Sequence, residues 1–144
     1  LQKLSEANPD EVQKYIDMTK DEKGFAMMVP IKRYELMVKH SLNRAEGLKN
    51  LKELASMSYE FRTRIKAIEA LKRLNYLDEE YLGHLFNAGT HFNNRLRGPA
   101  LAALRHYHDS GKAGYKRIIT ARYQQKQDWT PQERKWLEST MSFE

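Results

Sequence analysis

The sequence predicts an all-α fold, and three observations support this prediction. Apolar residues recur at helical spacing, as in the stripe of Ile65, Ile68, Leu71 and Leu74. Only 4 Pro and 7 Gly occur among the 144 residues, and they stand at intervals that suit helix ends. The sequence lacks an alternating run rich in Val, Ile and Thr, and it lacks an Asn-Gly hairpin turn, so nothing in it competes for a sheet.

Capping signals place the first and last helices. Asn8 stands before Pro9, with acids following, which is typical of a helix start. Thr130, Pro131 and Glu133 form the same signal with a capping box near the C-terminus, ahead of the apolar residues Trp136, Leu137 and Met141.

The helices between them are predicted from apolar stripes and from Pro and Gly. One helix covers the stripe at 61–74, and the next begins at the acids of 78–80, where the helix dipole favours negative charge, and ends at Gly89. We expect another helix to begin at Pro99 and to end near Gly111, and a further one over 115–122. Pro30 is expected to begin a helix closer to the N-terminus.

Two blocks of the sequence match at a constant spacing of 33 residues. Seven positions take part: Arg62, Arg64, Ala67, Ile68, Ala70, Leu71 and Leu74 match Arg95, Arg97, Ala100, Leu101, Ala103, Leu104 and Tyr107. A weaker third copy precedes them, with Tyr34 and Met37 ahead of Leu48 and Leu51. Periods of 20 to 50 residues are typical of stacked helical pairs, in which each copy buries its apolar face against its neighbours. The alanines allow neighbouring helices to approach closely.

The length fits one domain, residues 1–144. We expect residues 1–57 to form a less regular capping portion and residues 58–144 to carry the repeats. Because the sequence begins at Leu1 without Met, we also expect it to be processed or to be a fragment of a longer chain.

The repeated blocks carry a resemblance to known families. The pattern Arg62–Leu74, repeated at Arg95–Tyr107, resembles the second helix of HEAT/armadillo-type repeats, which implies a right-handed superhelix of about eight helices in four antiparallel pairs. Tyr59–Leu71, followed by Phe92–Ala100, resembles the C-terminal helical domain of zinc aminopeptidases of the aminopeptidase-N and leukotriene-hydrolase type.

The second resemblance implies a function without catalysis in this chain. The domain would shape the peptide-binding cleft of a metallopeptidase, with other domains of the parent protein and a peptide substrate as its partners. Arg95 or Arg97 would face the C-terminal carboxylate of the peptide. The zinc would belong to the parent enzyme, because this sequence has no His-Glu-x-x-His motif.

The charge pattern leaves a second function open. The formal net charge is +6, and the bases concentrate in residues 25–75 and 91–127. The candidate basic surface comprises Arg62, Arg64, Lys112, Lys116, Arg117 and Arg122. This surface is an alternative site for nucleic acid or another anion, although a solvated face against a partner domain is favoured. A protein-binding scaffold is a third alternative. Arg95 and Arg97 open a helix, where a cation needs a carboxylate, backbone carbonyls or a bound anion to compensate it.

Several function classes are excluded or disfavoured by the sequence. Cys is absent, which excludes thiol catalysis and disulfides. No apolar run approaches the ~20 residues of a membrane span. The five His lack carboxylates at ligand spacing, and Gly111 to Gly114 lack the features of a phosphate loop, so we predict no metal, cofactor or catalytic site in this chain.

Overall fold

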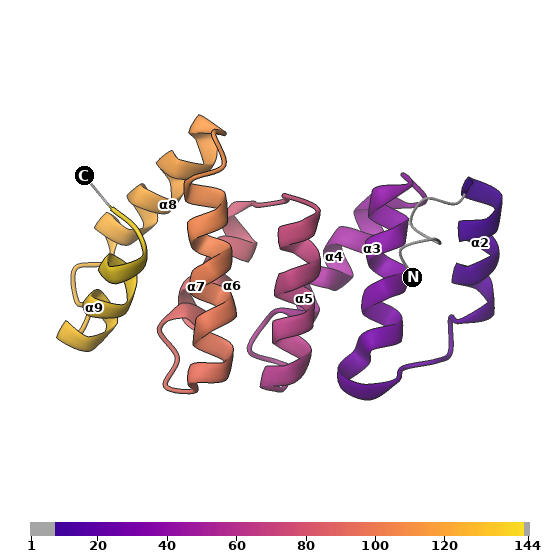
Figure 1. Cartoon of the computed structure of the whole chain (residues 1–144), viewed down its shortest axis with the longest axis horizontal. Coiled ribbons are helices and arrows are strands. Elements are labelled where there is room, and N and C mark those ends of the chain that lie inside the picture. The colour runs from indigo at the N-terminus through magenta and orange to yellow at the C-terminus, as the bar shows by residue number, and fades with distance from the viewer. Residues whose placement is uncertain (1–7, 143–144) are drawn as a thin grey trace. The chain divides into compact units, whose positions relative to one another are not determined.

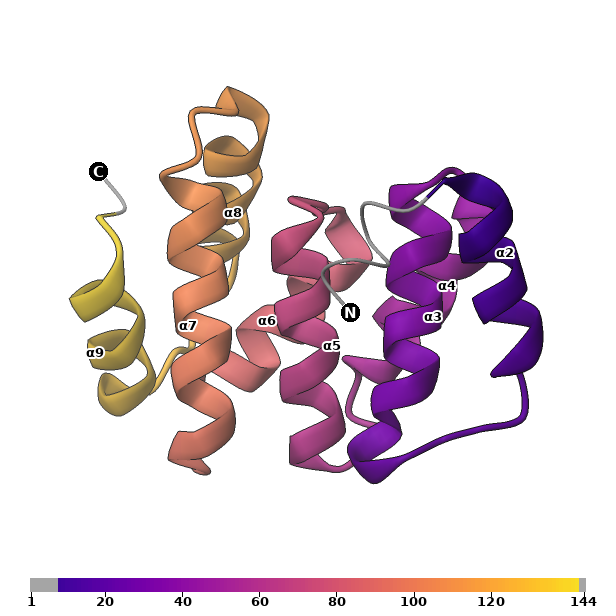
Figure 2. The ribbon, with the colours of Figure 1, turned by 45° about the vertical axis from the view of Figure 1, so that its right-hand side comes forward.

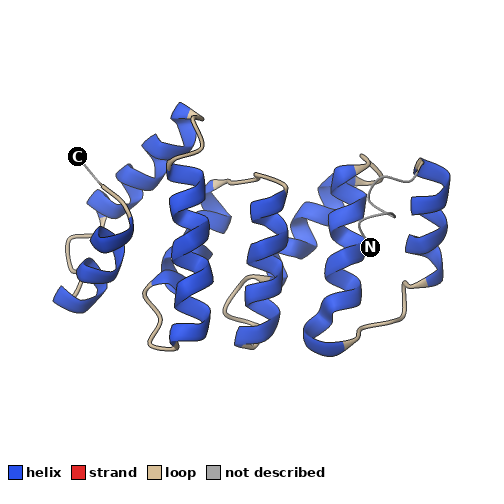
Figure 3. Ribbon diagram, in the orientation of Figure 1, coloured by secondary structure: helices blue, strands red, loops and turns tan. Residues whose placement is uncertain are grey.

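The computed structural model describes residues 8–142, which form eight α-helices and one 3-10 helix with no strand among them (Figure 3). The prediction of an all-α chain with about eight helices is therefore confirmed. In chain order the elements are α2 (Pro9–Met18), η1 (Phe25–Met27), α3 (Met28–Lys39), α4 (Arg44–Leu54), α5 (Phe61–Arg73), α6 (Glu79–Gly89), α7 (Asn94–His108), α8 (Ala113–Gln125) and α9 (Pro131–Thr140). Within the described range no helix combines the length and apolar character needed to cross a bilayer.

The chain divides into two compact units, Leu1–Leu74 and Asn75–Glu144. In the first unit α3 packs against α4 and α5, and α2 leans on α3 (Figure 1). Its core contains the fully buried side chains of Leu36, Leu51, Ile68 and Leu71. The predicted division after residue 57 stays a prediction, and the first seven residues of that capping portion lie outside the described range.

The second unit is built around α7. Helix α6 lies alongside α7 in both views, and α8 and α9 also contact α7 (Figures 1 and 2). The buried tyrosines Tyr81 and Tyr107 meet edge to face with ring centroids 6.3 Å apart, and Leu104 and Ile119 complete the same core. This unit therefore has its own hydrophobic core.

The repeat is visible in where helices begin and which residues they bury. Helices α3, α5 and α7 begin at Met28, Phe61 and Asn94, at successive intervals of 33 residues. The four alanines that match across α5 and α7 are fully buried, and so are the matching leucines; these residues are Ala67, Ala70, Ala100, Ala103, Leu71 and Leu104.

Side-chain caps form where the sequence indicates them. The Asn8 side chain accepts from Glu11 N at 3.0 Å, and Asp78 accepts from Tyr81 N at 2.8 Å. Thr130 and Glu133 form the reciprocal capping box. The helix predicted to end at Gly89 does so.

The predicted helix start at Pro99 is wrong. Helix α7 begins five residues earlier at Asn94, because the Asn93 side chain accepts from Arg95 N at 3.0 Å and caps the helix there. Pro99 then lies inside α7. Gly98 has no Cβ to clash with the proline ring, which makes the helical conformation before Pro99 accessible. Arg95 and Arg97 consequently belong to the first turn of the helix.

Candidate functional site

Arg97 is held by the backbone and by an aromatic ring. Its Nη1 donates to His91 O at 2.9 Å and to Phe92 O at 3.2 Å, just after the C-terminus of α6. The guanidinium also lies over the Trp136 ring of α9, 4.0 Å from its centroid. Backbone carbonyls, one of the compensating partners expected for this cation, are thus its partners. Arg97 joins α6, α7 and α9 rather than presenting a charge to a ligand.

Arg95 has the opposite environment. Its side chain is exposed, and within the part of the chain that the structure describes its guanidinium has no ion-pair partner. Beside it in sequence, Phe92 is 86% exposed and stacks on His91 with ring centroids 4.5 Å apart. Of the two arginines that the resemblance indicates, Arg95 is therefore the one that can receive a carboxylate.

The matching arginines of α5 repeat this division of roles. Arg64 is buried and donates from Nε to Ala55 O at 3.0 Å, at the C-cap of α4, and burial lowers the pKa of its guanidinium. Arg62 is exposed, pairs with Glu60 at 3.1 Å and lies over the Phe61 ring. Arg62 and Arg64 belong to the first compact unit, whereas Arg95 and Arg97 belong to the second.

A third arginine, in α3, also caps a preceding helix. The Arg33 Nη1 donates to Thr19 O at 2.8 Å, and Thr19 is the C-cap residue of α2. Arg33 is the sixth residue of its helix, whereas Arg64 and Arg97 are each the fourth, so the contact recurs with a shifted register. Sequence matching missed Arg33 for this reason.

The bases predicted on α8 separate into two groups. Lys112, Lys116 and Arg117 are exposed in the first turns, and Lys112 lies over the Tyr115 ring at 4.9 Å. Arg122 is half-buried on the same helix and packs against α6. A Cβ built at Gly83 would lie 3.2 Å from Arg122 Nη2, so only the absence of a side chain at that position leaves room for the guanidinium.

Arg122 also lines a cavity of about 400 Å³ within the second unit. Its Nη1 is buried and has no hydrogen-bond acceptor among the described residues. A buried donor without an acceptor costs about 1–3 kcal/mol, and more when the group is charged. The cavity was missed by the sequence analysis, because its other walls come from Phe86, Trp129 and neighbours on separate elements, whose meeting no local pattern shows.

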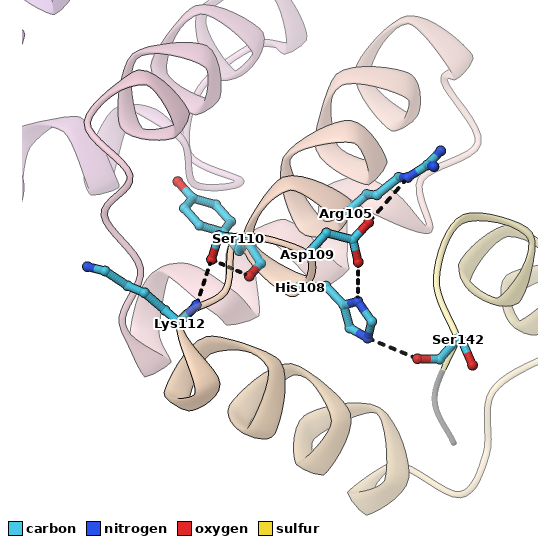
Figure 4. A network of polar contacts seen from close by, with 7 residues as sticks. Arg105, His108, Asp109, Ser110, Lys112 and Ser142 are labelled. Carbon is cyan, nitrogen blue, oxygen red and sulfur yellow. Dashed lines mark hydrogen bonds and ion pairs between the residues drawn. The ribbon is translucent and has the colours of Figure 1, made fainter.

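A polar network fixes the C-terminal segment beside α7 (Figure 4). The His108 ring lies 2.7 Å from Asp109 Oδ1 through Nδ1 and 2.9 Å from Ser142 O through Nε2. The hydrogen bond from His108 lowers the pKa of Asp109, and Arg105 lies 3.6 Å from the same carboxylate. Both acceptors can be satisfied together only when both ring nitrogens carry hydrogen.

Among the described residues no group of three or more His, Cys, Asp or Glu is placed to hold a metal ion. Comparison of the chain with protein-family models, with curated proteins and with solved structures returned no match.

Proposed function

We propose that this chain is a non-catalytic helical-repeat domain of the HEAT/armadillo kind, arranged as a right-handed superhelix, that serves as the C-terminal domain of a zinc aminopeptidase. In that role it shapes one side of a peptide-binding cleft. The zinc and the hydrolytic residues belong to other domains of the parent enzyme.

The observation that carries the proposal is the repeated arginine contact. Arg33, Arg64 and Arg97 lie in three helices that begin 33 residues apart, and each donates to carbonyls at the end of the preceding helix. Recurrent contacts at a constant period are typical of tandem helical repeats, in which every copy solves the same packing problem in the same way.

The peptide is bound through Arg95 in this proposal. An exposed guanidinium offers a planar fork that matches a carboxylate, and the exposed ring of Phe92 offers an apolar contact for a side chain near the peptide's C-terminus. Arg97 contributes indirectly, because it fixes the loop from which Phe92 and the start of α7 project.

The test is a titration of the chain with a short peptide that has a free C-terminal carboxylate and with the same peptide amidated. We expect the free acid to bind weakly and the Arg95→Gln variant to bind it about tenfold less tightly. The conservative Lys135→Gln variant, which loses the same charge from an exposed site on α9, controls for net charge. Equal binding of the amide, or zinc-dependent cleavage of the peptide by this chain alone, contradicts the proposal.

A nucleic-acid surface is the second candidate, and the exposed bases of α8 favour it. Lys112, Lys116 and Arg117 lie close in sequence without a carboxylate partner in the described part of the chain. This function requires affinity that falls steeply as salt concentration rises, because each phosphate contact releases counterions. Gel retardation of single-stranded and double-stranded DNA and RNA at low salt tests it, and a lack of any retarded species rules it out.

A further inference from the structure

The cavity in the second unit has one aromatic wall and one cationic wall. It measures about 400 Å³, which lies in the range of small-molecule sites, ~300–1,000 Å³. All of its lining comes from α6, α8, α9 and the segments that follow them, and none of it takes part in the peptide contact proposed for Arg95. The lining residues are Gly83, Phe86, Asn87, Thr90, Arg122, Lys126, Trp129 and Glu133.

Trp129 forms the centre of the aromatic wall. Its ring stacks on Phe86 with centroids 5.8 Å apart and an interplanar angle of 29°, and on Tyr123 at 5.9 Å and 17°. The indole N–H is already used, since Nε1 donates to Tyr123 O at 2.9 Å. The wall therefore offers ring faces and no further strong donor, which suits a flat apolar group.

The charges around the cavity leave one cation without compensation. Lys126 pairs with Asp128 at 2.7 Å, and Glu133 is held in the capping box by the Thr130 backbone at 2.9 Å. Arg122 remains, with its Nη1 buried and without an acceptor among the described residues. One uncompensated guanidinium beside a fixed carboxylate favours a ligand with a single negative charge over a doubly charged phosphate.

We propose that this cavity binds a small monocarboxylate with a flat apolar body. The carboxylate accepts hydrogen bonds from the Arg122 guanidinium, and the apolar body stacks against Trp129 and Phe86. Gly83 is part of the site because its missing side chain leaves the space in which the guanidinium lies. The inference is independent of the peptidase proposal, since it uses a different arginine and different elements.

The experiment titrates the chain with 3-phenylpropionate and follows the two indole N–H signals by NMR. The sequence has 2 Trp, and Trp136 lies under Arg97 rather than at the cavity, so it serves as an internal reference. We expect the Trp129 signal to shift in a saturable way while the Trp136 signal stays in place. The probes 3-phenylpropanamide, acetate and phenyl phosphate separate the contributions of charge, apolar body and anion type.

Two substitutions locate the charge. Arg122→Gln is expected to weaken binding of 3-phenylpropionate about tenfold or more, and Arg122→Lys, which keeps the charge but loses the fork, is expected to weaken it less. Lys135→Gln removes one positive charge from an exposed position on α9 and is expected to change affinity less than about twofold.

Four results overturn the inference: an unshifted Trp129 signal, equal binding of the amide, tighter binding of phenyl phosphate, or equal losses in Arg122→Gln and Lys135→Gln. None of these results bears on the peptide titration with Arg95→Gln, so the two proposals can fail separately. Thermal unfolding of each variant verifies that it is folded, and Arg122→Lys retains the test if Arg122→Gln does not fold.

Discussion

At the scale of single residues, the arginines of the second unit differ by what surrounds them. Arg97 is used by carbonyls and an aromatic face, Arg95 projects from the first turn of α7, and Arg122 is packed against a glycine with one nitrogen unsatisfied. The residue type predicts a positive charge at each position, but the neighbours decide whether that charge supports the fold or meets a ligand.

The first prediction compares Arg97→Ala with Arg95→Ala. Loss of Arg97 removes its hydrogen bonds to two carbonyls and its contact with Trp136, so we expect the free energy of unfolding to fall by about 1–3 kcal/mol. Arg95→Ala is expected to change it by less than about 0.5 kcal/mol, because the side chain is exposed. Urea unfolding of both variants measures the difference, and equal losses would contradict the roles assigned to the two residues.

The second prediction concerns Arg122. Replacing it with Met keeps the packing volume of the stem and removes the unsatisfied buried donor, so the free energy of unfolding should rise by about 0.5–2 kcal/mol. The same urea titration applies, with Arg117→Met as the exposed control on α8. A loss of stability in Arg122→Met would mean that the guanidinium already contributes to the fold and is not held for a ligand.

What the sequence could predict at this scale follows from how local the determinants are. The caps at Asn8, Asp78 and Thr130 depend on residues three positions away, and they form as predicted. The surroundings of Arg122 depend on Gly83 and Trp129, which are distant in sequence, so a basic stretch on α8 was all that could be seen.

At the scale of secondary-structure elements, the 33-residue period determines where the long helices begin and which small residues they bury. The matched alanines of α5 and α7 are fully buried, which agrees with close helix contacts at these positions. Pro99 misled the prediction because proline is most familiar at helix starts, whereas the Asn93 cap and Gly98 allow α7 to begin earlier.

The third prediction tests this packing by enlarging one small residue. Ala103→Leu inserts a side chain where α7 is fully buried, so we expect a loss of about 1–3 kcal/mol from overpacking. Ala70→Leu should cost a similar amount in α5. Ala102→Leu is the matched control, because Ala102 is exposed on the same helix. Thermal and urea unfolding provide the comparison, and a tolerated Ala103→Leu would argue against tight packing at this position.

At the scale of the whole molecule, the response to pH depends on buried tyrosines more than on the abundant surface charges. Burial raises the pKa of Tyr81 well above 10.0, and burial likewise raises the pKa of Tyr107, the neighbour whose ring it meets edge to face. Both rings lie in the core of the second unit, where ionisation would place a negative charge away from water. The fold therefore depends on keeping these two hydroxyl groups protonated.

The fourth prediction follows from the direction of these shifts. The folded chain retains tyrosine protons that the unfolded chain releases above pH ~10, so this contribution to stability is complete below pH ~10 and is lost as the pH rises toward the raised pKa values. Each buried tyrosine contributes a slope of up to about 1.4 kcal/mol per pH unit in that window. Tyr107→Phe should flatten the alkaline limb of a plot of unfolding free energy against pH, whereas Tyr59→Phe in the first unit controls for loss of a hydroxyl from a half-buried ring. Lysines titrate in the same range, but they do so equally in both variants, so the difference between the two curves isolates the buried ring. Identical slopes for Tyr107→Phe and the unsubstituted chain would show that the Tyr107 hydroxyl can ionise without opening the core.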